Sequence, residues 1–453
     1  MVEGPGPNQA SAADPTVALG AVLAQTVAHF FPKWNRWVGA LRDPRDPLRI
    51  IYPARFLVWT GLLLFLCKLG ARRQLLFTAH APTFLTNLNV LAETRLEQVE
   101  HPDTLAYLLG RLALTELPRL LTALVRRLLR MKVLDRFRLD GHVLVAVDGT
   151  GWVATKTRHC DHCLTKTHDG KVLYYYHHAV EAKLVTALGF TCSLATEFLE
   201  NVDPNASKQD CEQKAFHRLA ATVKRAFPQL RICLLLDSLF ACEPVVRCCH
   251  ALGWRYVITF KAGSMPERWD EFQRLKCLTP AYRRTLTRSE GTTQAFAWVH
   301  GLPVGEEVAN VLECIETAPD GTVTTFVWLT NWPLDATTAP RVANDGGRQR
   351  WKIENQGFND QKCGGYALEH LYSEDWHTAK NFYVLLQIAH LLAQLVEYGN
   401  LLRRALQGTI REMVGGVRSL ARYLRESLRT TPIPPEAVCS QAAASIQIRL
   451  DSS

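Results

Sequence analysis

Two aspartates stand directly after apolar runs that are typical of buried strands. HVLVAV (142–147) precedes Asp148, and RICLLL (231–236) precedes Asp237. A helix-forming stretch separates the two runs, so the second strand reaches the sheet through a crossover that favours a parallel neighbour. If that neighbour is the first strand, the two carboxylates lie side by side at one edge of the sheet. Carboxylates that close repel each other unless a cation lies between them, so the pattern predicts a divalent-metal site that needs a third ligand.

Glu354 is the third ligand that the sequence favours. It lies in RWKIENQGF (350–358), where a helix would place Arg350 and Glu354 on one face, with Gln361 or Lys362 further along it. One carboxylate would then face the metal ions, and a cation on either side of it would contact phosphates. Ligation by oxygen alone suits Mg²⁺ or Mn²⁺ rather than zinc. Each acid taken singly is also typical of a turn, a helix cap or a solvated helix, so only the combination favours a site.

A cysteine–histidine segment follows the first strand. RHCDHCLTKTHDG holds Cys160 and Cys163 in a CxxC pair, which can form one half of a tetrahedral zinc site. His168 is the expected third ligand, and His177 or His178 a fourth. The chain has no second CxxC pair, so a polar loop with reduced thiols is the alternative interpretation.

The 453-residue chain is basic at both ends. Lys and Arg outnumber Asp and Glu by 52 to 43, and the positive charge concentrates in residues 1–140 (net +7) and 401–430 (net +5). This layout fits two solvated arginine-rich helix faces, or two phosphate-contacting segments around a carboxylate site. Thirteen cysteines, and a leader at 1–15 without the basic-then-apolar order of a signal peptide, favour the reducing cytoplasm, at the nucleoid if DNA is the partner. The longest uncharged apolar run, Phe56 to Cys67, is shorter than the roughly 20 residues of a membrane span, which predicts no membrane segment.

Strand and helix patterns alternate through the middle of the chain. Strands are predicted at 142–147, 172–179, 183–195, 231–236 and 254–261, and helices at 208–227 and 243–251. Short alternating pieces within 283–330, joined by glycine-containing turns, predict an antiparallel β insertion. Leucine spacing predicts helices before residue 140, and a core helix is expected from Asp375 to Leu406.

The fold class that follows is α/β. The predicted division is a disordered leader at 1–15, a helical region at 16–140, a core built from 141–270 and 340–406, a β-rich insertion at 271–339, and a basic C-terminal helix and tail at 407–453.

Three motifs resemble a known family. VAVDGT, LLLDSLF and RWKIENQGF are similar to the acidic motifs of insertion-sequence DDE transposases, and the last resembles the Tyr-Arg-Glu-Lys signature of one branch that carries a β-rich insertion before its glutamate. The resemblance covers about residues 141–400. It implies a ribonuclease H-like catalytic core, metal ligation and catalysis by Asp148, Asp237 and Glu354, and phosphate contact by Arg350.

The signature is incomplete in this chain. Its tyrosine falls at Gly347 and its lysine at Gln361, with Lys362 one residue later. Lys362 can replace the signature lysine as a phosphate contact only if the helix is locally distorted or ends there, as Gly364 and Gly365 suggest. The departures concern the accessory phosphate contacts and leave the metal triad intact.

The resemblance implies that the protein cuts DNA at transposon ends and joins those ends to target DNA. Two divalent cations, Mg²⁺ or Mn²⁺, would be held by the triad, and double-stranded DNA would be bound by a homodimer whose region 16–140 recognises the ends. Trp298 in the insertion could stack on a flipped base, although a tryptophan in a small β unit more often belongs to its core. A nuclease that does not join ends, and a DNA-binding derivative without catalysis, are the alternatives.

Overall fold

The computed structural model describes residues 19–158, 160–201, 209–410, 412, 415–439, 441 and 446–451. The expected disordered leader at 1–15 lies outside these residues. The chain forms two compact units, one helical and one built around a sheet. The mixed α/β class is confirmed, because helices come first, a ten-stranded sheet with parallel and antiparallel pairs follows, and helices close the chain.

The helical unit joins both ends of the chain. It takes the described residues up to Glu116, residues 364–366 and the described residues from Ile388 onward. Its helices are α1 (Leu19–Phe30), α2 (Trp34–Gly39), η2 (Pro47–Arg49), α3 (Ala54–Leu66), α4 (Gln74–Ala79), α5 (Pro82–Ala92), α6 (Pro102–Leu109), the second half of α13 (Trp376–Glu397), α14 (Asn400–Leu406), α16 (Val417–Thr430) and η8 (Pro435–Val438). Every residue of α3 from Phe56 to Leu66 is buried, so this apolar run is a core helix. In the described ranges, no helix is both long and apolar enough to cross a bilayer.

Asn87 ties the two ends of the chain together within this unit. Its side-chain amide donates to the backbone oxygens of Leu428 (2.9 Å) and Thr431 (2.8 Å), and its Oδ1 accepts from the backbone N–H of Ile433 (2.6 Å). Because Asn87 is fully buried, these three bonds are shielded from water. The C-terminal helix therefore belongs to the same unit as the N-terminal helices and is not a separate tail.

The second unit comprises Leu117–Cys363 and Ala367–Gln387. Its strands are β1 (Val143–Thr155), β2 (Leu164–His168), β3 (Lys171–Val185), β4 (Thr191–Leu199), β5 (Ile232–Leu236), β6 (Arg255–Thr259), β7 (Arg283–Thr287), β8 (Thr293–Val304), β9 (Glu307–Thr317) and β10 (Val323–Thr330). Its helices are α7 (Glu116–Arg130), η3 (Asp135–Phe137), α8 (Glu212–Ala226), η4 (Ser238–Phe240), α9 (Glu243–Leu252), α10 (Pro266–Leu278), α11 (Thr338–Arg341), η5 (Val342–Gly346), η6 (Gly347–Gln349), η7 (Ile353–Asn359), α12 (Asp360–Cys363) and the first half of α13. The division from the helical unit falls beside Glu116, ahead of the predicted boundary at 140, because Arg126 of α7 donates to the backbone oxygen of Ala226 at the end of α8 (2.8 Å).

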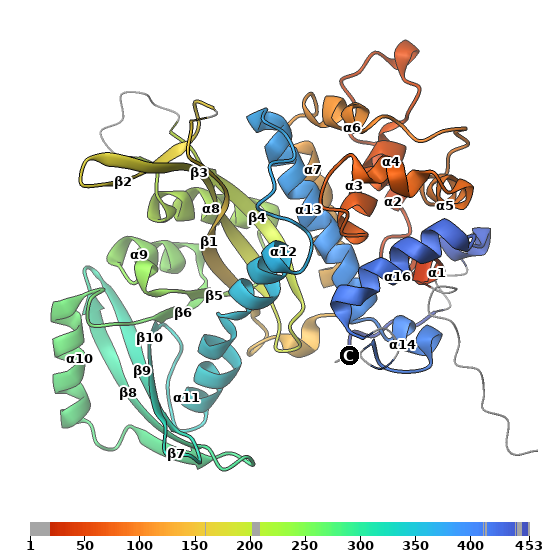
Figure 1. The fold of residues 1–453 in the computed structure, drawn as a ribbon. Coiled ribbons are helices and arrows are strands. Elements are labelled where there is room, and N and C mark those ends of the chain that lie inside the picture. The colour runs from red at the N-terminus through yellow and green to blue at the C-terminus, as the bar shows by residue number, and fades with distance from the viewer. Residues whose placement is uncertain are drawn as a thin grey trace, which may run out of the picture. The chain divides into compact units, whose positions relative to one another are not determined.

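The strands form one sheet with the order β2-β3-β1-β5-β6-β10-β9-β8-β7, and β4 pairs with the other part of β3. β1, β5 and β6 run parallel to one another, whereas β3 is antiparallel to β1 and to β4. Helix α8 connects β4 to β5 and packs on β3 and β4 (Figure 1). This is the crossover and parallel pairing that the sequence predicts for the two strands that precede the aspartates.

The predicted β insertion is an extension of the same sheet. β10 pairs antiparallel with β6, and β9, β8 and β7 follow in order (Figure 1). A single apolar cluster joins the two parts, since Trp298 and Trp328 of the extension share it with Leu144 and Leu235 of the parallel strands. The extension and the parallel strands therefore share one continuous core.

One predicted turn is wrong. The sequence places a turn between residues 179 and 183, but β3 runs without interruption from Lys171 to Val185, and the chain reverses afterwards at Gly189. Glu181 falls in the predicted turn, and Lys183 was expected to begin the next strand. In the structure both are fully buried and lie within ion-pair distance, Nζ to Oε2, of each other (3.8 Å).

Candidate active site and metal centre

Asp148 lies within β1, which continues to Thr155 instead of ending at the aspartate as predicted, whereas Asp237 directly follows the end of β5. β1 and β5 pair in parallel from Val143 with Ile232 to Ala146 with Leu235. Each aspartate follows the last of these pairs by two residues. The two carboxylates are therefore level with each other across the strands, and each raises the electrostatic cost of ionising its neighbours.

Asp148 is the more enclosed of the two. Its side chain is 16% exposed, its Oδ1 accepts from the backbone N–H of Gly149 (2.9 Å), and its Oδ2 lies 3.6 Å from Nη1 of Arg350. Burial raises the pKa of Asp148 to about 7, with Arg350 acting against the shift and the negative charges of Glu354 and Asp237 adding to it. A cation bound beside Asp148 would favour its ionised form, because the positive charge offsets both the burial of the carboxylate and the repulsion from Glu354 and Asp237.

Asp237 has a structural role as well as a place in the cluster. It follows β5, and its Oδ1 accepts from the backbone N–H of Leu239 (2.9 Å), which caps the short helix η4. Burial raises its pKa, and the charges of Glu212 and Glu354 add to the shift. The cap uses one carboxylate oxygen, so the other remains available to a ligand.

Glu354 comes from η7, a helical segment with wide π-type turns. Its Oε1 accepts from Nη2 of Arg350 at 2.6 Å, and its side chain is 49% exposed. Arg350 thus contacts both Asp148 and Glu354. Wide turns of this kind are frequent at functional sites. The three predicted acids lie near one another and around Arg350, and Asp148, Asp237, Glu354 and Arg350 together form the acidic cluster.

Gly347 explains one departure from the resembled signature. It is buried, and a Cβ atom added to it would lie 2.5 Å from the ring of Trp328. That contact leaves no room for any side chain. The position where the signature has a tyrosine is therefore filled by close packing of the backbone on Trp328.

Two residues lie next to the acidic cluster that the sequence did not assign to it: Glu212, and His178, which was expected as a possible zinc ligand. His178 on β3 and Glu212 in the first turn of α8 lie 2.8 Å apart, Nε2 to Oε1. Both side chains pack against Gly149. A Cβ atom at position 149 would lie 2.2 Å from Glu212 Oε1 and 2.4 Å from His178 Nε2, so only glycine fits there. The strand directions could have pointed to Glu212. Because β4 and β5 both run parallel to β1, helix α8, which connects β4 to β5, begins on the side of the sheet where Asp148 and Asp237 lie. An acidic residue in the first turn of that helix therefore points to the site.

A large pocket adjoins Arg350. Its volume is about 730 Å³, and its lining is basic and aromatic. Lys261, Arg348 and Arg350 contribute the positive charges, and Trp351 offers a ring that is 44% exposed. Such a mixture suits a phosphate backbone and a stacked base.

Trp298 does not lie in this pocket. It is 4% exposed, belongs to the apolar cluster of the sheet, and stacks on Tyr282 with ring centroids 6.1 Å apart. The expected base-stacking role is therefore not available to it, and the alternative core role is the observed one. Trp351, which the sequence analysis did not single out, has the exposed ring.

Lys362 also lies away from the acidic cluster. Its Nζ pairs with Glu369 Oε1 (3.1 Å), and the residue lines a separate pocket of about 590 Å³ with His178, Tyr174 and Tyr176. Arg350 pairs instead with Asp148 and Glu354, so the two cations have different acidic partners. It could contact a phosphate in its own pocket, but not beside the triad.

The cysteine pair forms a second cluster. Cys160 Sγ lies 3.6 Å from Cys163 Sγ and 3.3 Å from His177 Nε2, and Cys163 Sγ lies 3.6 Å from the same nitrogen. Among the described residues, this is the one group of three His, Cys, Asp or Glu whose ligand atoms all lie within 4.8 Å of one another. The triad carboxylates are less closely gathered.

His168 is not part of the cysteine cluster. It lies at the tip of the β2–β3 hairpin, where its side chain is 74% exposed and faces Asp169 (3.5 Å, Nε2 to Oδ2). The predicted third ligand is therefore wrong, and His177 takes its place. His178, the next residue on the strand, turns the other way toward Glu212.

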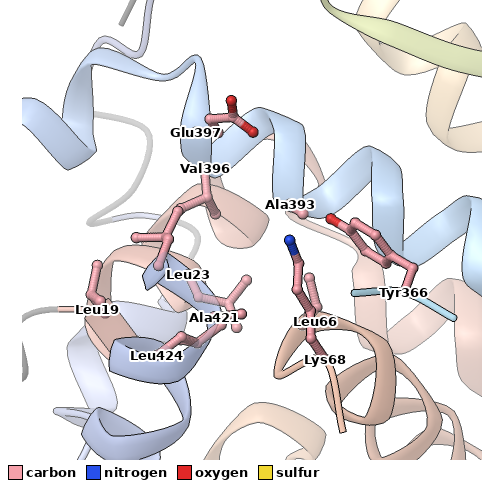
Figure 2. Close-up of a pocket in the computed structure, with 11 residues that line it drawn as sticks. Leu19, Leu23, Leu66, Lys68, Tyr366, Ala393, Val396, Glu397, Ala421 and Leu424 are labelled. Atoms are coloured by element: carbon pink, nitrogen blue, oxygen red, sulfur yellow. The ribbon is translucent and has the colours of Figure 1, made fainter. Parts of the chain in front are cut away.

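The helical unit has a small cavity of its own (Figure 2). Leucines of α1, α3 and α16 line it, and the Lys68 ammonium lies 4.8 Å from the centroid of the Tyr366 ring. Its volume of about 40 Å³ holds a few water molecules. It is too small for a nucleotide, so the clusters of the sheet unit remain the candidate sites.

Comparison with known proteins adds no further assignment: no family model matches the chain, and no curated protein is similar to it.

Proposed function

We propose that the protein is a DDE transposase that cuts DNA at transposon ends and joins the freed ends to target DNA. The observation that carries this proposal is the convergence of three acids from distant parts of the chain. Asp148 and Asp237 lie level on parallel strands, and Glu354 is linked to Asp148 through their shared contact with Arg350.

The sheet topology supports the same proposal. The partial order β4-β3-β1-β5-β6, with an antiparallel first half and a parallel second half, is that of a ribonuclease H-like core. Strands β7 to β10 come between Asp237 and Glu354, which is where the resembled branch carries its β insertion. The proposed core thus keeps the motif order of that branch.

The donor set fits hard divalent cations. Asp148, Asp237 and Glu354 offer carboxylate oxygens, which Mg²⁺ and Mn²⁺ prefer. When bound, two such ions activate the attacking oxygen and stabilise the leaving oxygen of an in-line phosphoryl transfer. Arg350 holds two of the carboxylates in place and can donate to a phosphate, and Glu212 fixes the orientation of His178 beside the cluster.

DNA would pass over the pocket beside Arg350. Lys261 and Arg348 would neutralise phosphates, and Trp351 would stack on an unpaired base. The basic helical region at 16–140 would recognise the transposon ends. Two ends must be cut together, so a homodimer on double-stranded DNA is the proposed functional form.

Two structural details favour a second candidate, a derivative that binds DNA without cutting it. Gly347 has no room for the signature tyrosine, and Lys362 faces a different pocket from the triad. Both features would weaken phosphate positioning while leaving the basic surfaces intact. A nuclease that cuts without joining is the third reading of the same fold.

One assay separates these functions. The purified full chain is incubated with Mg²⁺ and DNA that carries the inverted repeats flanking its gene, and both cleavage and joining of precut ends are measured. The proposal expects both reactions, and it expects Asp148→Asn and Glu354→Gln to abolish them. Asp169→Asn is the matched control, because Asp169 is an exposed hairpin aspartate at φ 48°, a conformation that asparagine adopts equally well.

The possible results lead to distinct conclusions. Cleavage without joining would identify a nuclease. Salt-sensitive DNA binding with neither reaction, in Mg²⁺ or Mn²⁺, would identify the inactive derivative. Cleavage that survives Asp148→Asn would remove the acidic cluster from the reaction and the proposal with it.

A further inference from the structure

The cysteine cluster has no part in the proposed phosphoryl transfer, yet it is the most closely gathered ligand group in the described chain. We propose that Cys160, Cys163 and His177 bind one zinc ion, and that this ion is structural. It would fasten the connection between β1 and β2, and the β2–β3 hairpin, against the start of helix α13. The proposal does not depend on whether the protein is a transposase.

The distances between the three ligand atoms fit a tetrahedral zinc ion. With Zn–S bonds of about 2.3 Å and Zn–N bonds of about 2.0–2.1 Å, tetrahedral angles place two sulfurs about 3.8 Å apart and a sulfur and a nitrogen about 3.6 Å apart. The observed separations are 3.6 Å between the sulfurs, and 3.3 and 3.6 Å from the sulfurs to His177 Nε2. The three atoms already lie at nearly the spacing that a shared ion requires.

The hairpin register brings the ligands together. β2 and β3 pair with Leu164 opposite Tyr176, so the residues next to that pair, Cys163 and His177, are neighbours across the hairpin. Cys160 comes back to them through the tight turn of the CxxC pair. Both Cys163 and His177 are buried, and two thiolates with an imidazole suit zinc better than Mg²⁺.

Aromatic packing around the site favours a structural role for the ion. The Trp376 ring stacks on the His177 ring with centroids 3.8 Å apart and an interplanar angle of 18°, and Trp152 lies 6.0 Å from the same histidine. Trp376 is the first residue of α13, where its Nε1 donates to Glu200, and Lys380 also pairs with Glu200 (2.5 Å, Nζ to Oε1). A zinc ion bound to His177 would therefore hold in place the imidazole ring on which Trp376, the first residue of α13, stacks.

A disulfide does not account for the cluster. The sulfur separation of 3.6 Å is far from the bond length of about 2.05 Å. Among the described residues three ligands gather here, and a tetrahedral ion has one further position.

Metal analysis of the full-length protein tests the proposal. The chain is produced with zinc and a reducing agent, dialysed, and its zinc content is measured by mass spectrometry. We expect about one zinc per chain, which Cys163→Ser and His177→Ala should reduce to near zero. His168→Ala and Cys277→Ser are the matched controls, because His168 and Cys277 are exposed and lie outside the cluster, and they should keep the full content.

Two results would overturn the site. One is wild-type protein that retains no zinc after exposure to it, and the other is zinc that is lost in His168→Ala but kept in His177→Ala. If the ligand variants fail to fold, cobalt on the wild-type protein decides instead: two thiolate ligands give a strong near-ultraviolet charge-transfer band, and its absence rejects the site.

Hydrogen exchange tests the structural role separately. Removing zinc with a chelator should speed amide exchange in residues 160–178 and at the start of α13, with no change in β8 and β9. Unchanged exchange around a site that does bind zinc would show that the ion does not hold the hairpin, and would reject the structural role.

Discussion

The acidic cluster takes Asp148 from β1, and the cysteine cluster takes His177 from β3 and its two cysteines from the connection between β1 and β2. The two clusters are built differently. The cysteine cluster already has its ligand atoms at tetrahedral spacing, because neutral thiols and an imidazole do not repel one another. The acidic cluster is more open, and Arg350 lies between two of its carboxylates. Like charges in a partly buried site keep apart until a cation joins them.

This difference implies different roles for the ions that the two clusters would bind. A preformed site with soft ligands suits an ion that stays in place and stabilises the fold. An open site with carboxylates that resist ionisation suits ions that arrive with a substrate and leave with it.

The largest expected effect is on the reaction. Asp148→Asn should lower DNA cleavage by on the order of a thousandfold, because it removes a ligand charge from the reacting centre. The same variant should keep its zinc and should be at least as stable as wild type without Mg²⁺, since it removes a desolvated charge that faces Asp237 and Glu354. Metal analysis and denaturant unfolding measure both properties, and loss of zinc or of stability would show that the two clusters are not independent.

A buried ion pair on β3 should have the next largest effect. Lys183 donates to Gln387 Oε1 (2.5 Å) and lies 3.8 Å from Glu181, which accepts from Ser193 and Thr196. Lys183→Met should cost about 3–5 kcal/mol of unfolding free energy, because it leaves a buried carboxylate without its cation.

The double variant Lys183→Met/Glu181→Gln controls for that interpretation. It removes both charges and should recover much of the lost stability in denaturant unfolding. If Lys183→Met lowers the unfolding free energy by less than about 1 kcal/mol, the Lys183–Glu181 pair is neutral in the folded protein.

Glu212 should affect the reaction more mildly. It contacts His178 rather than the triad, so Glu212→Gln should lower cleavage by about 10- to 100-fold, as removal of an orienting partner usually does. Glu267→Gln is the matched control, since Glu267 is an exposed first-turn glutamate on α10. Equal activity of the two variants would exclude Glu212 from the site.

The smallest effect is a pH dependence that only the acidic cluster should show. The folded pKa of Asp148 is raised to about 7, so between about pH 4 and about pH 7 the folded state binds more protons than the unfolded state. Stability without metal should therefore fall as the pH rises through this interval, and Mg²⁺ should restore more of it above pH 7 than below. The difference between wild type and Asp148→Asn, measured by thermal unfolding across the pH range, isolates this contribution, and a difference that does not change with pH would contradict it.

Much of the fold could be predicted from local patterns. Apolar β-branched runs identify β1 and β5, leucine spacing identifies the helical ends, and short alternating pieces identify the strands from β7 to β10. The parallel pairing of β1 with β5 follows from the helical connection between them. Asp148 and Asp237 could be placed together for that reason alone.

Errors arose where distant residues change the meaning of a local pattern. Glu181 suggests a turn until Ser193 is seen to satisfy it inside the protein. His168 is close to the cysteines in sequence, but the register of the hairpin places His177 beside them. Trp298 and Trp351 are alike in sequence, and only packing decides which ring is exposed.

By itself, the sequence determined which apolar runs are followed by acids, how the strands that contain those runs connect, and which cysteines stand close enough to share an ion. These properties depend on neighbours along the chain and on the rules of strand crossover. Tertiary structure decided which of the candidate residues meet: His177 rather than His168 lies beside the cysteines, and His178 pairs with Glu212 next to the acids. Strand register and the packing of α8 on β3 and β4 set those partners, and both arise from contacts between separate segments of the chain.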